Sequence, residues 1–349
     1  MPVLGMAEDE QHSDFVWTWK SSMRGMRASI WVPYFHSAER IPNSRKWKIA
    51  YNGGELVVDF KKVDFIMFYG ASGAIPLAFL DDLSQHKIIT MIHRRNQVHP
   101  YVLYPPNLGD DLDVVSRQIA YRNNKQKKAY IARTLIHARL TRMRTVCSVH
   151  QGIGKVLAQA KTVEAIRNIE ATTTARYWKK WFERTGCDFN RRSDTPLAAA
   201  LNAGSKFMMG IVLRWVLFHK LSPTHGYLHE PTSYPSLVYD LMEPYRYIFE
   251  DAAYSAWERC GNDAKQLVGT TLNLLKESLD EPVYVPATRQ MVRRKNLLHG
   301  GVLALRAYLL GEVPRLVLPL EGEKRGGRPP KTGYQLPGEM SRKRKLRGD

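Results

Sequence analysis

Three residues well suited to chemistry lie close together in the sequence: His229, Asp240 and Glu243. The two acids are three residues apart in a segment with helical apolar spacing, so they share one face of a helix. Apolar neighbours such as Leu237 and Leu241 would bury much of that helix. Two carboxylates on a largely apolar helix are costly unless something positive faces them, and a divalent metal would supply that charge.

A further carboxylate, Glu170, lies in an upstream helical segment beside Ile166, Ile169 and Tyr177. A Glu, a His and an Asp from separate elements could meet as ligands. Several hard oxygens, one nitrogen and no thiolate suit Mg²⁺ or Mn²⁺ better than zinc. Such a site can polarise a phosphodiester and activate a water or a sugar hydroxyl.

Simpler interpretations of the same residues remain open. A single His such as His229 can cap a helix, and an acid pair at this spacing often lies on a solvated face. Glu170 could pair with Arg167 or Arg176 on its own helix. Spacing alone therefore does not decide between a metal site and these alternatives.

The elements that must position these residues divide into two kinds. Short runs rich in Ile, Val, Phe and Tyr, separated by turn signals, predict a small β-rich domain over residues 29–108. Asn52-Gly53 predicts a hairpin turn, and residues 75–85 a short helix across the strands. From 109 to 320 the apolar spacing becomes helical and predicts a larger all-α catalytic domain, giving an α+β protein.

Charge and composition narrow the class of partner. The 349 residues include 52 Lys and Arg against 33 Asp and Glu, a net charge of +19, which favours a polyanion such as nucleic acid. The three cysteines, none close to another in sequence, exclude a disulfide scaffold and suit a reducing cytoplasm. Residues 207–218 form the longest apolar stretch, which is too short to cross a bilayer and predicts a buried core helix.

The positive charge is concentrated in two places. Residues 114–163 contain no acid, so their cations lack the partners of an ordinary solvated helix and predict a surface that tracks DNA phosphates. The predicted DNA-binding residues there are Arg117, Arg122, Lys125, Lys127, Lys128, Arg133 and Arg139.

The two chain ends are predicted to lie outside the folded domains. The sequence predicts that residues 1–28 form an N-terminal extension. Residues 321–349, rich in Gly, Pro, Lys and Arg, read as a disordered basic tail that tethers DNA. Within that tail, Arg328 between Gly327 and Pro329 could reach into a minor groove.

Two motifs resemble the CRISPR-associated Cas-one family, the metal-dependent endonucleases and integrases of spacer acquisition. The first is Glu170 with the aromatic pair Tyr177 and Trp178. The second runs through Gly-x-x-His at 226–229 and Ser-Leu-x-x-Asp-Leu-x-Glu at 236–243 to Arg246. The sequence departs from the family at Ala171, where a Gly is usual, and Arg176 is displaced by one position.

The resemblance implies a specific chemistry. Glu170, His229 and Asp240 would be the metal ligands, Glu243 an auxiliary acid, and Mg²⁺ or Mn²⁺ the cofactor. The 3′-hydroxyl of a short DNA fragment would attack a phosphodiester at the edge of a repeat. His229 would either bind the metal or protonate the leaving oxygen. The family works on double-stranded DNA as dimers of dimers, usually bridged by a small Cas-two partner.

Two other functions remain open from the sequence. One is a transposon-encoded integrase of the same fold, which would mobilise its own element. The other is a non-enzymatic nucleic-acid-binding protein, which explains the charge equally well but not the carboxylates beside His229. The genes next to this one would separate the first of these from a CRISPR integrase.

Overall fold

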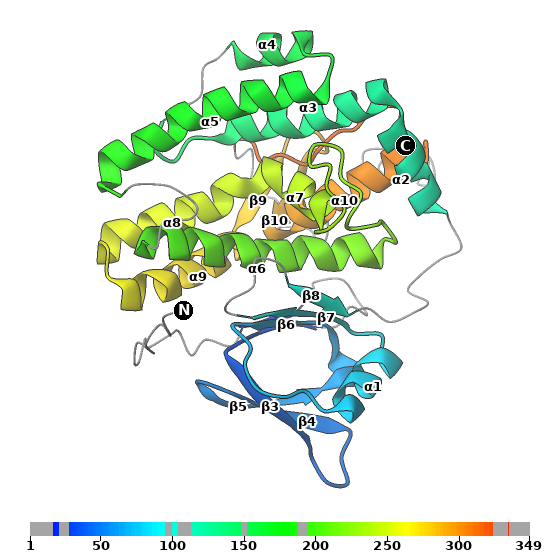
Figure 1. The fold of residues 1–349 in the computed structure, drawn as a ribbon, viewed down its shortest axis with the longest axis vertical. Coiled ribbons are helices and arrows are strands. Elements are labelled where there is room, and N and C mark those ends of the chain that lie inside the picture. Colours follow the sequence, from blue (N-terminus) through cyan, green and yellow to red (C-terminus); the bar gives the residue numbers. More distant parts are fainter. Residues whose placement is uncertain are drawn as a thin grey trace, which may run out of the picture.

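The fold, seen in a computed structural model, places a β-rich part below a helical part (Figure 1). The structure describes residues 17–20, 28–94, 100–103, 113–147, 152–187, 195–323 and 334. The predicted boundary near residue 108 and the predicted groove-binding residue Arg328 lie outside these ranges. The α+β class predicted from the sequence is confirmed.

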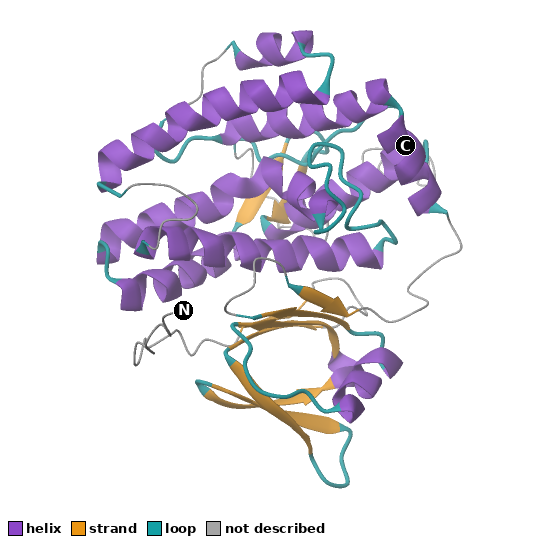
Figure 2. Ribbon diagram, viewed as in Figure 1, coloured by secondary structure: helices purple, strands orange, loops and turns teal. Residues whose placement is uncertain are grey.

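The β-rich part consists of a five-stranded and a three-stranded sheet (Figure 2). The larger sheet has the order β1-β2-β6-β7-β8, with β2, β6 and β7 parallel and the two outer strands antiparallel. The smaller sheet is an antiparallel meander, β3-β4-β5. The strands are β1 (Trp17–Lys20), β2 (Ala28–Pro33), β3 (Phe35–Arg40), β4 (Lys46–Tyr51), β5 (Gly54–Asp59), β6 (Val63–Tyr69), β7 (Ile89–His93) and β8 (Tyr101–Leu103).

Side-chain alternation along the strands lets the larger sheet serve two cores. Ile30 and Val32 of β2 face the core between the two sheets, whereas Trp31 faces the helices and packs on Phe207. The short η1 (Phe60–Lys62) and the predicted short helix, α1 (Leu77–Gln85), adjoin the inter-sheet core. The predicted hairpin is confirmed, because β4 pairs with β5 around Asn52-Gly53.

The helical part begins with two helices, α2 and α3, that follow each other directly. The break between α2 and α3 falls at Asn124, whose side chain accepts a hydrogen bond from Lys127 N and caps the second helix. The helices are α2 (Val114–Asn123), α3 (Lys125–Arg142), α4 (Ile153–Gln159), α5 (Val163–Thr185), α6 (Pro196–Phe218), α7 (Ser236–Met242), η2 (Glu243–Tyr245), α8 (Arg246–Cys260), α9 (Ala264–Asp280) and α10 (Lys295–Leu309).

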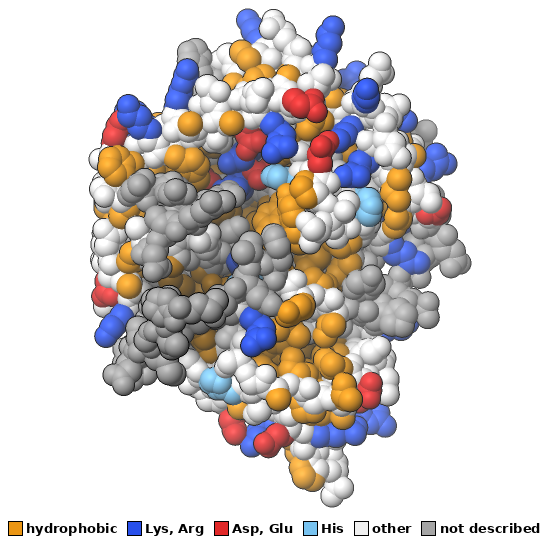
Figure 3. All heavy atoms as spheres, in the orientation of Figure 1, with side chains coloured by type: hydrophobic (Ala, Val, Ile, Leu, Met, Phe, Trp, Pro, Cys, Tyr) orange, Lys and Arg blue, Asp and Glu red, His pale blue; other side chains and the backbone are white. Residues whose placement is uncertain are grey.

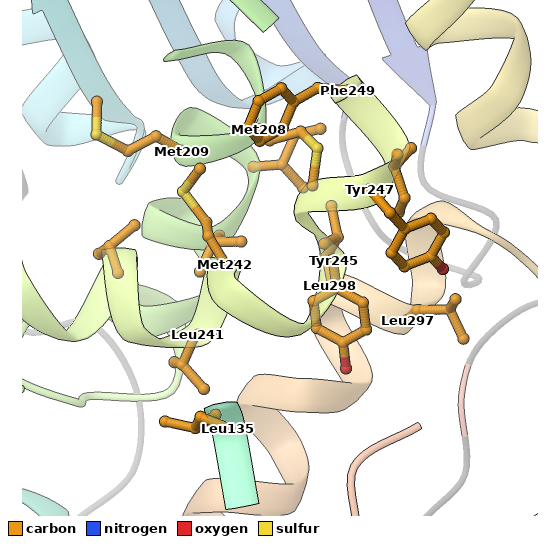
Figure 4. Packing of buried hydrophobic residues seen from close by; sticks show 14 of the residues in the cluster. Leu135, Met208, Met209, Leu241, Met242, Tyr245, Tyr247, Phe249, Leu297 and Leu298 are labelled. Atoms are coloured by element: carbon orange, nitrogen blue, oxygen red, sulfur yellow. The ribbon is translucent and has the colours of Figure 1, made fainter. Parts of the chain in front are cut away.

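Helix α6 is the central helix of the core. Its Met208 and Met209 lie close to Met242, the last residue of α7, and to Phe249 of α8 (Figure 4). Among the described residues it alone is long and apolar enough to cross a membrane, but 72% of its most apolar window is buried inside the protein. The prediction of a buried core helix over 207–218 is therefore confirmed. Its Arg214 is paired with Asp64 of β6, which ties the helices to the larger sheet.

The helical part is not purely helical, contrary to the prediction. Strands β9 (Pro282–Val285) and β10 (Gln290–Arg293) form a hairpin within the range 109–320, where the apolar spacing predicted helices throughout. The alternating Val283 and Val285 bury one side of this hairpin, together with Val292. The apolar residues here therefore alternate as in a β-strand and do not follow the spacing of a helix.

The start of the predicted disordered tail is packed against the helical part. Glu321 is buried and forms ion pairs with Arg144 and Arg294. Tyr334 is 4% exposed and its ring lies against Gly300, where an added Cβ would come within 2.6 Å of it. The expectation that everything after residue 320 is disordered is thus wrong for these two residues, because each is held by partners from the helical part.

Candidate active site

His229 is positioned by the carboxylate of Asp240, which lies on α7 and is completely buried. Oδ2 of Asp240 accepts hydrogen bonds from the backbone N–H groups of Tyr227 (2.5 Å) and Leu228 (2.9 Å). Oδ1 accepts one from His229 N at 3.0 Å and lies 2.7 Å from His229 Nδ1. With Nδ1 donating to this carboxylate, the lone pair of the imidazole is on Nε2.

The loop that carries His229 needs a glycine at position 226. A Cβ there would come within 2.7 Å of His229 O and 2.8 Å of Asp240 Oδ2. Arg122 of α2 holds the same loop by donating from Nε to Gly226 O at 2.9 Å and from Nη2 to Glu230 O at 2.6 Å. The Gly-x-x-His spacing in the sequence therefore reflects a close approach of the loop to Asp240.

Two further acids face each other across a buried arginine. Arg139 of α3 contacts Glu170 of α5 and Glu243 of η2 through the same nitrogen, Nη1, with Glu243 Oε2 at 2.7 Å. The side chain of Arg139 is 6% exposed and that of Glu243 is 4% exposed. Glu170 does not pair with the arginines of its own helix, which was the simpler interpretation of its sequence context; it pairs with a residue from a different helix.

The ion pairs continue around a ring that closes on α5. Arg246 lies 3.5 Å from Glu243 and 3.4 Å from Glu250, and Tyr177 of α5 donates to Glu250 at 3.1 Å. Three carboxylates against two guanidinium groups leave this ring with one negative charge in excess. The arrangement therefore attracts an additional positive charge.

The acids and the histidine influence one another electrostatically. Burial raises the pKa of Glu170; the charge of Arg139 opposes this rise, and that of Glu243 adds to it. Burial by itself would lower the pKa of His229. The hydrogen bond to Asp240 and the negative charges of Asp240, Glu243 and Glu170 outweigh it and raise that pKa above its usual value. The charges of Glu170 and Glu243 thus act on His229, and the charge of His229 acts on Glu170.

The donor types in this cluster fit a hard divalent cation. Two carboxylates and one imidazole nitrogen are ligands that Mg²⁺ and Mn²⁺ accept, and a carboxylate behind the imidazole is a common support of a metal-binding histidine. As they stand, no three such side chains among the described residues are arranged to hold a metal ion. Glu170 and Glu243 instead share the positively charged Nη1 of Arg139.

The predicted role of Asp240 as a metal ligand does not fit this geometry. Its two oxygens accept four hydrogen bonds from the loop 227–229, and it has no exposed surface. Glu243, expected to be the auxiliary acid, is instead the carboxylate that meets Glu170 across Arg139. The structure brings all four predicted residues together, but in two pairs with different roles.

The predicted DNA-binding cations separate into two groups. Several have partners inside the protein: Arg122 as above, Lys128 with Glu230, Arg133 with Ala160 O at 3.0 Å, and the buried Arg139. The argument that these cations lack internal partners was wrong, because their partners come from distant parts of the chain. In Figure 3, acidic side chains lie among basic ones on the helical half of the face in view.

The remaining basic residues are exposed. Arg117, Lys125 and Lys127 lie on the surface of α2 and α3, with the ammonium of Lys127 3.9 Å from the centre of the Tyr121 ring. These three residues are the part of the acid-free stretch that is placed to meet an outside anion. Arg328 lies outside the described residues, as noted above.

Sequence reasoning missed the ring of ion pairs. It placed Arg139 on a DNA-binding face and noted Arg246 only as part of a motif. One signal was present for Glu250, which lies four residues after Arg246 and seven after Glu243, the spacing of one helix face. For Arg139 the sequence offers no comparable signal, because its partners are brought by α5 and η2.

Comparison with known proteins shows the family of this chain. The family model described as CRISPR associated protein Cas1 matches residues 43–266, which is more than half of the chain. The chain belongs to the CRISPR-associated Cas1 family. It is 27% identical to CRISPR-associated endonuclease Cas1 2 of Moorella thermoacetica, in an alignment that covers 56% of this chain and 70% of that protein.

Solved structures show the same fold as this Cas1 chain. A casposase bound to its integration product has a TM-score of 0.71 at 20% identity and covers 84% of this chain and 94% of its own. A Cas1 protein from Thermotoga maritima has a TM-score of 0.67 at 18% identity, with coverage of 84% and 100%. A chain of a Cas6-RT-Cas1–Cas2 complex reaches 0.67 at 11% identity, with coverage of 84% and 36%.

Proposed function

We propose that this Cas1 protein is a divalent-metal-dependent DNA endonuclease and integrase. It joins the 3′-hydroxyl of a short DNA fragment to a phosphodiester at the edge of a CRISPR repeat. The observation that carries the proposal is a pair of carboxylates, the partly buried Glu170 and the buried Glu243, held together by a positive charge beside the oriented imidazole of His229. Family membership and the names of the relatives point in the same direction.

Glu170, Glu243 and Nε2 of His229 would hold Mg²⁺ or Mn²⁺. Asp240 then acts through His229: it fixes the ring orientation and keeps the proton on Nδ1. The chemistry such a cation supplies is neutralisation of the negative charge that develops on the phosphate oxygens. If His229 does not bind the ion, the same Nε2 can protonate the leaving oxygen.

The partners follow from the same proposal. Double-stranded DNA is the substrate, and the exposed cations of α2 and α3 are positioned to bind its phosphates. Integration of both ends of one fragment requires two active sites, so we expect a homodimer or a dimer of dimers in the cytoplasm. A small Cas2 protein is the expected bridge, since one of the structures of the same fold is a Cas1–Cas2 complex.

A transposon-encoded integrase would use the same site. The casposase shares the fold but is only 20% identical, so it does not favour that role over integration at a CRISPR repeat. The Moorella relative is more similar in sequence and is a CRISPR-associated endonuclease, which favours the CRISPR role. A repeat array beside the gene would support this role, and transposon ends would contradict it.

The proposal is tested by a strand-transfer assay. Protein stripped with EDTA is mixed with a labelled DNA fragment and a repeat-bearing plasmid, with or without Mn²⁺. We expect joined product only with the ion, and none from His229→Ala, whose fold is verified by circular dichroism. Equal joining in EDTA, or near-normal joining by the variant, would contradict the proposal.

A further inference from the structure

Among the described residues, Arg139 is the cation that pairs with Glu170, and a single nitrogen of its guanidinium contacts both the Glu170 and the Glu243 carboxylate. Nη1 contacts Oε1 of Glu170 and lies 2.7 Å from Oε2 of Glu243. The group is almost completely buried, and its Nε has no hydrogen-bond partner among the described residues. The described contacts of this guanidinium with the two acids therefore pass through Nη1 alone, which places its positive charge between them.

The positive charge of Arg139 stabilises the two acids while no metal ion is bound. Glu170 and Glu243 belong to different elements, α5 and η2. Glu243 is buried and Glu170 is partly buried, so their negative charges repel each other. A positive charge between them offsets this repulsion and holds α5 and η2 at a fixed separation. A metal ion bound by both carboxylates needs the place that Nη1 holds, so the ion and the arginine cannot bind there together.

We infer that Arg139 is an internal counter-ion: it holds the Glu170 and Glu243 carboxylates in place while the site lacks metal, and it must leave them when a divalent cation binds. This inference rests on the proposed function. Arg139 is thus a positioning residue. It keeps the empty site assembled but lowers the apparent affinity of that site for metal, because the ion competes with it.

The inference predicts opposite effects of removing the arginine on stability and on metal binding. Arg139→Gln removes the charge but leaves a polar side chain of similar reach. Without metal, the variant should melt at a lower temperature than the wild type. Mn²⁺ should then raise its melting temperature by more than it raises that of the wild type, because the ion replaces the missing charge.

Arg214→Gln is the matched control. Arg214 is also buried, at 3% exposure, and is paired with an acid, Asp64, but this pair joins α6 to β6 away from the site. Loss of this arginine should lower the melting temperature as well. The increase produced by Mn²⁺ should remain that of the wild type.

The experiment measures the melting temperature and the Mn²⁺ dissociation constant of the full chain without DNA, by thermal unfolding and calorimetry at pH 8. We expect Arg139→Gln to bind Mn²⁺ at least tenfold more tightly than the wild type. Equal or weaker binding by the variant, with normal binding by the wild type, would overturn the inference and leave the proposed function standing. No binding by the wild type would overturn both.

A variant that fails to fold would still be informative. Folding of Arg139→Gln only in the presence of Mn²⁺ supports the inference. If it folds in neither condition, Arg139→Lys keeps the charge on a shorter side chain that spans the two acids less well. Tighter Mn²⁺ binding by Arg139→Lys than by the wild type supports competition, and unchanged binding contradicts it.

Discussion

Asp240 and Glu243 lie three residues apart but make different contacts. Asp240 accepts four hydrogen bonds from the His229 loop and is fully buried, whereas Glu243 meets Glu170 across Arg139. The first therefore orients the imidazole, and the second is the carboxylate that we propose as an ion ligand. Their spacing in the sequence places both on one helix face but does not distinguish these roles.

This division of roles predicts different losses in two isosteric variants. Asp240→Asn should still bind Mn²⁺, with affinity lowered about 10- to 100-fold, because His229 loses its orienting partner. It should also lose about 1–3 kcal/mol of stability, since the new amide N–H₂ group would face backbone N–H donors. Glu243→Gln should lose Mn²⁺ binding altogether.

Calorimetric titration of both variants with Mn²⁺ measures the difference, and thermal unfolding provides the stability control. The opposite result, binding abolished by Asp240→Asn and retained by Glu243→Gln, would make Asp240 the ligand. That outcome would restore the assignment expected from the sequence resemblance.

The sequence predicted all four acidic and imidazole side chains of the site, because a His loop and two acids at helical spacing are local patterns. The pairing could not be predicted in the same way. Whether a carboxylate meets backbone amides, as Asp240 does, or a guanidinium, as Glu243 does, depends on how η2, α3 and α5 pack. Arg139 shows this most clearly, since it is 31 residues from Glu170 in the sequence.

Helices α2 and α3 carry both exposed cations and cations that have partners inside the protein. The double variant Arg117→Gln/Lys125→Gln should weaken binding to DNA of any sequence. Each lost phosphate contact should lower the slope of log K against log[salt] by roughly 0.9. Fluorescence anisotropy over a range of salt concentrations measures this slope.

The control for this experiment removes the same charge elsewhere. Lys61 and Lys62 are exposed on η1 in the β-rich part, so Lys61→Gln/Lys62→Gln changes the net charge equally. We expect its slope to stay near that of the wild type. The same reduction in both double variants would mean that α2 and α3 contribute only net charge.

Helices α6 and α10 meet at a pair of histidines that should make stability depend on pH. His299 stacks on Trp215 with ring centroids 3.5 Å apart, and its Nε2 lies 2.8 Å from Nε2 of His219. Burial, the charge of His219 and the charge of Arg214 hold the pKa of His299 well below its usual value. Arg214 is itself paired with Asp64.

The sign of the pH effect follows from this shift. Below about pH 6.5 the unfolded chain protonates His299 whereas the folded chain does not, so the free energy of unfolding falls as the pH falls. This group contributes a slope approaching about 1.4 kcal/mol per pH unit. His299→Gln should therefore show a shallower decline between pH 7 and 5 in denaturant unfolding.

A matched substitution, His137→Gln, removes an exposed histidine from α3 and should leave the decline unchanged. An equally steep decline in wild type and His299→Gln would contradict the assignment to this pair. The fold of each variant at pH 7 is checked first, because removal of the stacked ring also lowers stability at every pH.

Whether a segment is a helix or a strand could be predicted where its apolar residues follow a single spacing. Helix α6 is an example, and its apolar residues fill the core. The type of element could not be predicted where a short apolar run fits both the helical spacing and the alternation of a strand. Residues 282–293 form a hairpin because Val283, Val285 and Val292 reach the core only from extended backbone. The break at Asn124 had a local capping signal, but α3 also depends on packing against α5 and η2.

At the scale of the whole molecule, the chain end is fixed by Glu321 and Tyr334. Truncation after Leu320 removes the ion pairs of Glu321 with Arg144 and Arg294, and it leaves a cavity where the Tyr334 ring lay against Gly300. We expect a loss of about 3 kcal/mol or more in the free energy of unfolding, the size typical of removing a buried aromatic ring. Denaturant unfolding of the truncated chain measures it.

Truncation after Tyr334 is the control, since it keeps both anchors and removes only residues 335–349. This shorter deletion should unfold like the full chain. If both truncated chains were as stable as the full chain, Tyr334 and Glu321 would contribute nothing to the fold, as the composition of the tail had suggested.

The most direct test of the account is to locate the ion in a crystal of the protein soaked with Mn²⁺, by anomalous diffraction at the manganese edge. We predict one anomalous peak in contact with Glu170, Glu243 and Nε2 of His229, with the Arg139 guanidinium moved away from both carboxylates and Asp240 still bonded to the His229 loop. A peak bound to Asp240 in place of Glu243, or no peak with Arg139 still between the acids, would contradict the account.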